Sequence, residues 1–189
     1  WKETGKSGGG LTYNLGSHLI DQTVQLFGMP EAIFADIATL RTNGVVDDYF
    51  MIHFLRPKFA PEVKVTLKAS YLMREAEPRF TLHGTLGSYV KYGVDKQEAA
   101  LLRGEMPNQP RWGEESEQEW GLIHTEINGT EIHRKYPSIA GNYGFYQNIY
   151  EYLREGKPLL TGAKNILDVI RIIEAAYQSQ REGKIIELK

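Results

Sequence analysis

The pair Asn-Gly occurs twice in the chain, at residues 43–44 and 128–129, and each time it separates two strand-like stretches. Asn-Gly is the strongest short signal for a β-hairpin, because both residues tolerate the positive φ that tight hairpin turns require. The sequence therefore predicts antiparallel pairing on both sides of each turn. The stretches joined in this way are 32–41 with 45–54 and 120–127 with 130–136.

The other expected elements are grouped along the chain rather than alternating. Further strands are expected at 62–72, 79–85, 88–93 and 184–189, and helices at 11–27, 95–104, 142–156 and 162–183. Segregated elements of this kind predict an α+β fold with an open, mostly antiparallel sheet and helices packed on one face. The stretch 45–54 is apolar on both faces, so we expect the other sheet face to make oligomer contacts, most simply in a homodimer.

Composition narrows the class of protein. A length of 189 residues and a hydrophobic fraction of 41% suit one domain, 1–189, with a core of its own. A net charge of −2 with interspersed signs predicts no nucleic-acid partner, and no apolar run reaches the roughly 18 residues of a membrane span. Because the chain has no Cys, thiolate metal sites and thiol nucleophiles are excluded, and a reducing, cytoplasmic location is expected.

The first ten residues, WKETGKSGGG, lack both a Met and an apolar strand leading into the glycines. We therefore expect a fragment or mature segment of a longer protein. No G-x-G-x-x-G or G-x-x-x-x-G-K-[ST] motif occurs in the chain, so a nucleotide-phosphate loop is not expected within it.

One narrow polar strip stands out on the expected helix 11–27. At about 100° per residue, Asn14, His18, Asp21 and Gln25 fall within an arc of roughly 60°, and most of the remaining surface is apolar. Such a helix is expected to be mostly buried, with only the strip facing a cleft. His18 can exchange a proton near neutral pH, and Asn14 or Asp21 one turn away can orient its ring. A purely structural polar network fits the spacing equally well. A metal site is less favoured, because no third ligand lies nearby in the sequence.

Three segments resemble a known family. GGGLTYNLGSHLIDQTVQLFG (8–28) resembles the G-G-G-x-L-x-D-x-G-x-H-x-x-D segment that opens the C-terminal domain of the glucose–fructose oxidoreductase / inositol dehydrogenase / rhizopine catabolism family. Residues 83–104 are similar to its mid-domain strands and helix, especially in the scyllo-inositol-dehydrogenase-like branch, and residues 145–188 are similar to its closing helices and strand. The three segments follow the family order and span nearly the whole chain.

The resemblance implies an NAD- or NADP-dependent oxidoreductase that acts on the hydroxyl of a sugar or cyclitol. An N-terminal Rossmann domain, absent from this chain, would bind the nucleotide and supply a catalytic Lys. No cofactor is therefore expected in this chain, which should be inactive alone. His18 matches the family His that accepts a proton while hydride leaves the substrate, and Asp21 matches the Asp three residues later that supports it.

Asn14 departs from the family pattern, which has Asp at this position. Asn keeps the hydrogen-bonding shape but loses the negative charge, so His18 is expected to be less basic than in relatives. The alternative interpretation is a non-catalytic α+β module for dimerisation or ligand sensing in which His18 is structural.

Overall fold

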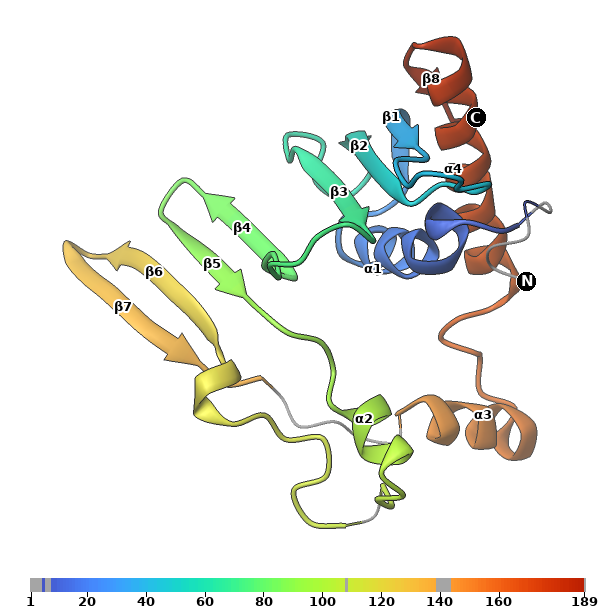
Figure 1. Ribbon diagram of the computed structural model, residues 1–189. Coiled ribbons are helices and arrows are strands. Elements are labelled where there is room, and N and C mark those ends of the chain that lie inside the picture. The colour runs from blue at the N-terminus through green and yellow to red at the C-terminus, as the bar shows by residue number, and fades with distance from the viewer. Residues whose placement is uncertain (1–4, 6–7, 108, 139–143, 189) are drawn as a thin grey trace. The chain divides into compact units, whose positions relative to one another are not determined.

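The computed structural model describes residues 5, 8–107, 109–138 and 144–188, which group into two compact units (Figure 1). Unit 1 comprises Trp1–Met73 and Leu160–Lys189, and unit 2 comprises Arg74–Leu159. Each unit contains its own four-stranded sheet. None of the helices within these described residues is long and apolar enough to cross a membrane.

Unit 1 is built on an antiparallel sheet with strand order β3-β2-β1-β8. Its strands are β1 (Pro30–Ala38), β2 (Tyr49–Pro57), β3 (Val65–Ser70) and β8 (Ile186–Glu187). Its helical segments are the π-helical turn η1 (Thr12–Gly16), α1 (Ser17–Phe27) and α4 (Ala163–Glu182). The elements follow the predicted order, with shorter strands than expected.

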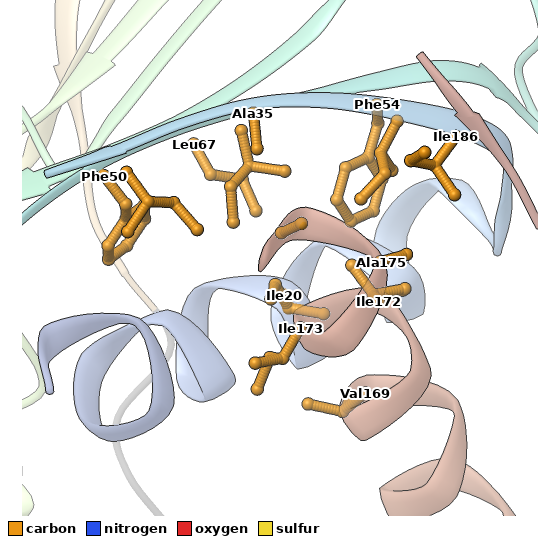
Figure 2. Close-up of a cluster of buried hydrophobic side chains, with 14 of the residues drawn as sticks. Ile20, Ala35, Phe50, Phe54, Leu67, Val169, Ile172, Ile173, Ala175 and Ile186 are labelled. Carbon is orange, nitrogen blue, oxygen red and sulfur yellow. The ribbon is translucent and has the colours of Figure 1, made fainter. Parts of the chain in front are cut away.

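The core of unit 1 lies between the sheet and the two helices α1 and α4. Figure 2 shows Phe50, Phe54 and Leu67 pointing from the strands toward Ile20 of α1 and Ile172 of α4. The strand side chains recur at every second residue and the helical ones at three- and four-residue spacing, so each element turns one apolar face inward. Helix α1, which carries His18, Asp21 and Gln25 of the polar strip, is thereby fixed against the sheet.

The opposite face of this sheet also carries apolar side chains. The β1–β2 register pairs Phe34 with His53 and Asp36 with Met51, and these alternate with the core-facing residues. We call this surface the outer face and define it by Phe34, Asp36, Tyr49, Met51, His53, Leu55, Thr66 and Lys68. Since α1 and α4 share the inner core, neither helix covers the outer face.

The β1–β2 connection is longer than the predicted two-residue turn. Asn43 has the expected positive φ of 64°, but β1 ends at Ala38 and β2 begins only at Tyr49. The reason is the buried Asp48 carboxylate, which accepts hydrogen bonds from the backbone N–H groups of Leu40 and Arg41 at 2.7 and 3.0 Å. Those groups are then unavailable for the strand ladder, and Asn43-Gly44 becomes the tip of a wider loop.

Unit 2 contains the antiparallel sheet β4-β5-β6-β7 and three short helical segments. The elements are β4 (Phe80–Gly84), β5 (Gly87–Lys91), α2 (Gln97–Leu102), η2 (Glu117–Glu119), β6 (Gly121–Ile127), β7 (Thr130–Tyr136) and α3 (Gly144–Glu155). The Asn128-Gly129 hairpin is confirmed, with φ values of 52° and 75° at its two turn residues.

The predicted α+β class with open antiparallel pairing is confirmed, but the strands divide between two sheets instead of forming the single predicted sheet. Within the described residues β3 pairs only with β2, and β4 pairs only with β5. The intervening segment 71–79 contains four charged residues and Pro78, which lacks the N–H that a ladder would need.

Candidate functional site

The predicted helix 11–27 begins with a π-helical turn rather than an α-turn. Gly10, at a φ of +92°, directs the chain into η1, and its carbonyl accepts a hydrogen bond from Asn14 N–H at 3.1 Å. The helix ends at Gly28, whose φ of 80° suits glycine, as the sequence predicted. Single π-turns within helices are rare and often lie at functional sites.

Of the three predicted site residues, Asn14 lies in η1, and His18 and Asp21 lie in α1. His18 is exposed, whereas Asn14 and Asp21 are half-buried. Within the described residues no hydrogen bond or ion pair joins His18 to Asn14 or Asp21, and no cluster of three His, Asp or Glu residues could hold a metal ion. The His18 ring is therefore available to a molecule that reaches this face of the helix.

Asn14 instead contacts a residue that the sequence did not indicate. Its Nδ2 donates a hydrogen bond to the Tyr71 hydroxyl oxygen at 3.2 Å, and its carbonyl accepts one from Ser17 Oγ at 3.0 Å. Tyr71 follows β3 directly and lies 57 residues away in the sequence, so no local pattern could identify the pair. The structure thus brings Tyr71 beside the polar strip.

Tyr71 is itself held by the β1–β2 loop. Its backbone N–H donates to the Asp48 carbonyl at 3.0 Å, and the Arg41 guanidinium lies 5.4 Å from the centre of its ring. Arg41 Nε also donates to the Asp48 carboxylate at 2.8 Å. Burial alone would raise the pKa of Asp48, but the hydrogen bonds from Leu40 and Arg41 outweigh burial and hold this pKa below its usual value.

A second polar cluster surrounds the start of η1. The Asp47 carboxylate accepts hydrogen bonds from Thr12 N–H, Thr12 Oγ1 and the Tyr177 hydroxyl at 2.7, 2.8 and 2.6 Å. Tyr177 also stacks on Tyr13, with ring centroids 5.6 Å apart, and Tyr13 donates to Glu174 of α4.

Both phenols in this cluster are held in the neutral form. Burial, followed by the hydrogen bond to Glu174, raises the pKa of Tyr13 to about 12. Burial and the Asp47 carboxylate raise the pKa of Tyr177 as well. The only sequence signal for this cluster was the acidic pair 47–48 inside an otherwise apolar stretch.

The other four histidines all lie on strands. His53 contacts Thr66 Oγ1 on the outer face at 3.0 Å. In unit 2, His83 contacts Ser88 Oγ at 2.8 Å, and His124 contacts Glu131 across the β6–β7 hairpin at 2.7 Å.

Comparison with known proteins identifies the family of this chain. Residues 1–188 match the model of the Oxidoreductase family, C-terminal alpha/beta domain, which is the family of glucose–fructose oxidoreductase, inositol dehydrogenase and rhizopine catabolism proteins. The chain belongs to this family. Among the family's proteins, scyllo-inositol 2-dehydrogenase (NADP⁺) IolW of Bacillus subtilis is 36% identical over 190 residues. That match covers 100% of this chain and 52% of IolW.

Solved structures agree with this family assignment. A Bacteroides fragilis protein classed as an oxidoreductase is 78% identical, with a TM-score of 0.91 over 95% of this chain and 53% of its own. YvaA of Bacillus subtilis is 36% identical, with a TM-score of 0.90 over 97% of this chain and 52% of its own. The chain therefore spans about half the length of the family members it matches.

Proposed function

We propose that the chain, residues 1–189, is the C-terminal domain of an NAD- or NADP-dependent oxidoreductase that oxidises a hydroxyl group of a sugar or cyclitol. The observation that carries this proposal is the exposed His18 on a helix whose other face is fixed in the core. Its chemical class is supported by the 36% identity to a scyllo-inositol 2-dehydrogenase. Within the described residues His18 makes no hydrogen bond to Asn14 or Asp21, which weighs against the alternative of a structural polar network.

His18 is assigned the proton transfer. Oxidation of a secondary alcohol removes the hydroxyl proton and a hydride from the carbinol carbon, leaving a carbonyl. An imidazole within about 3 Å of the hydroxyl can accept that proton as the carbonyl forms. Asn14 contributes a neutral amide beside the substrate position, and Asp21, one turn beyond His18, supports the helix or the His.

Within the residues that the structure describes, the glycine run does not offer the open backbone that a nucleotide phosphate needs. The glycine run ends at Gly10, where an added Cβ would lie 2.0 Å from the Asp47 carboxylate, and this negative charge would repel a phosphate. When bound, the nicotinamide supplies the hydride acceptor. We assign its binding to the part of the protein outside this chain, consistent with the chain covering 52% of IolW.

The outer face is assigned to self-association. Phe34, Met51 and Leu55 would otherwise leave apolar surface in water, and antiparallel sheets with one uncovered apolar face commonly meet a partner there. A second copy of the protein presents the same face, so a two-fold related pair can cover both. A cytoplasmic location stays a prediction from the Cys-free composition.

The test uses the full-length protein and a panel of cyclitols and sugars with NAD⁺ and with NADP⁺. His18→Ala is expected to lower kcat/KM by about 10²- to 10⁴-fold, the usual contribution of a general base, with an unchanged melting temperature. His124→Ala, which removes another exposed His, is the matched control and should retain activity. Full activity in His18→Ala would contradict the catalytic assignment, and a sharply lowered melting temperature would favour the structural alternative.

A further inference from the structure

The start of the helix that carries His18 is held by one residue from the β1–β2 loop. Asp47 accepts the Leu11 N–H at its backbone carbonyl at 2.9 Å, and its carboxylate Oδ2 accepts both Thr12 donors at 2.7 and 2.8 Å. Leu11, at the N-cap position, provides no side-chain cap of its own. Asp47 therefore satisfies the first donors of the helix from 35 residues away.

The second carboxylate oxygen of Asp47 is occupied as well. Oδ1 accepts the Tyr177 hydroxyl at 2.6 Å, and it lies so close to Gly10 that a Cβ there would be 2.0 Å away. The carboxylate is thus buried, with α4 on one side and the glycine run on the other. It joins η1 to α4 at a fixed distance, because neither contact can be lost without leaving a buried polar group unpaired.

This contact determines where the polar strip lies. Asn14 is two residues beyond Thr12, and His18 is one further turn along the same helical segment. A change in the position of Thr12 therefore moves Asn14 relative to Tyr71 and moves His18 with it. Proton transfer requires hydrogen-bond reach, and a displacement of about 1 Å can cost a factor of about 10² in rate.

We propose that Asp47 is a positioning residue for His18. It acts through Thr12, and does not itself touch the reacting atoms. This inference rests on the proposed function, in which His18 accepts the substrate proton. Tyr177 and Gly10 take part in the same contact. Tyr177 donates a hydrogen bond to Asp47, and Gly10 leaves space beside the Asp47 carboxylate.

The test is Asp47→Asn in the full-length protein, with scyllo-inositol and NADP⁺ or the panel polyol that the wild-type protein oxidises fastest. Asn keeps the shape of the Asp side chain, but its amide N–H₂ then faces groups that are themselves hydrogen-bond donors. We expect kcat to fall about 10- to 100-fold while KM stays within about threefold. A larger primary deuterium isotope effect should show that hydride transfer has become slower. Peptide 11–18 should exchange its amide hydrogens faster, a readout that needs no substrate.

Ser179→Ala is the matched control. Ser179 is also buried, on α4, where its Oγ accepts a hydrogen bond from Ala35 N–H at 3.0 Å and donates one to the Lys184 carbonyl at 2.7 Å. Its loss should lower the melting temperature and leave kcat, the isotope effect and the exchange of peptide 11–18 unchanged. If Asp47→Asn behaves in the same way as Ser179→Ala, the positioning role is overturned.

A second variant covers the case in which Asp47→Asn does not fold. Thr12→Val removes the hydrogen bond that Thr12 Oγ1 donates to Asp47 and keeps the one from the Thr12 backbone N–H, so it is expected to lower kcat about 3- to 10-fold, with faster exchange in peptide 11–18. Wild-type kcat and exchange in Thr12→Val overturn the inference. His18→Ala, assayed in parallel, separates the two proposals: its full activity defeats the proposed function, whereas its inactivity beside unaffected Asp47 and Thr12 variants defeats the positioning role alone.

Discussion

Asn14 Nδ2 donates a hydrogen bond to the Tyr71 hydroxyl oxygen over 3.2 Å, joining the first helix to the residue that follows β3. This bond uses one of the two Nδ2–H donors of Asn14, whereas the phenolic proton of Tyr71 has no acceptor within the described residues. With Asp at position 14, as in the family pattern, the phenol would have to donate instead. Asn14→Asp would therefore reverse the direction of this hydrogen bond as well as adding a charge.

Asn14→Asp is the first prediction. A carboxylate one turn from His18 stabilises the protonated ring, so the limb of the pH–rate profile that reports His18 deprotonation should move to higher pH. The measurement is kcat/KM against pH in the full-length protein. Tyr71→Phe, which removes the hydroxyl but not the charge, should leave the position of that limb unchanged. An unaltered profile in Asn14→Asp would show that position 14 does not influence His18.

The second prediction concerns acid stability. Asp48 is fully buried and its pKa is lowered. Its contribution to the free energy of unfolding is therefore complete above the ordinary Asp pKa of about 3.9. The free energy of unfolding should decrease as the pH falls below that value, and the loss should be complete only below the folded-state pKa. Asp48→Asn, which turns an amide toward three N–H donors, should cost about 3 kcal/mol in urea unfolding at neutral pH.

The control for Asp48 is Glu62→Gln, a change at an exposed carboxylate in the same unit. It should shift the free energy of unfolding by less than about 0.5 kcal/mol. If both variants show the acid sensitivity of the wild-type protein, Asp48 is not its source.

Alkaline stability gives the third prediction. The pKa of Tyr13 is raised to about 12, so folded protein retains a proton that an unfolded chain loses near pH 10. The stabilisation is complete below pH 10 and should be lost as the pH rises toward 12. Tyr13→Phe should reduce the fall in melting temperature over this interval, whereas Tyr150→Phe, on an exposed part of α3, should not. Equal slopes in all three proteins would contradict the prediction.

The fourth prediction tests the outer face. Phe34 is 37% exposed and stacks on His53 at a centroid distance of 6.4 Å. Phe34→Glu would place a charge in the centre of an apolar interface, where its desolvation disfavours association. Sedimentation over a range of protein concentrations should show the wild-type protein as an oligomer and Phe34→Glu shifted toward monomer. Val45→Glu, an exposed apolar position outside the outer face, should sediment like wild type.

Local patterns predicted most of the elements, because hairpins and amphipathic helices depend on neighbouring residues. The Asn128-Gly129 turn and the end of α1 at Gly28 were predictable for that reason. The contacts of Thr12 with Asp47 and of Asn14 with Tyr71 join residues 35 and 57 positions apart, so periodicity carried no information about them. The π-helical turn could not be predicted either, since a spacing of four residues fits both an α-helix and a π-helix. The division into two sheets depends on which strands pair, and residue alternation does not specify that.

Unit 1 is assembled from two segments that lie far apart in the sequence, Trp1–Met73 and Leu160–Lys189. During synthesis, the β1–β2–β3 meander is made long before α4 supplies Ile172 and Ile173 to its core. Long-range closure of this kind slows folding, because chain entropy must be lost before the distant contacts form. Tyr177 also arrives late, so its hydrogen bond to Asp47, beside the start of the His18 helix, forms only after residue 177 has left the ribosome.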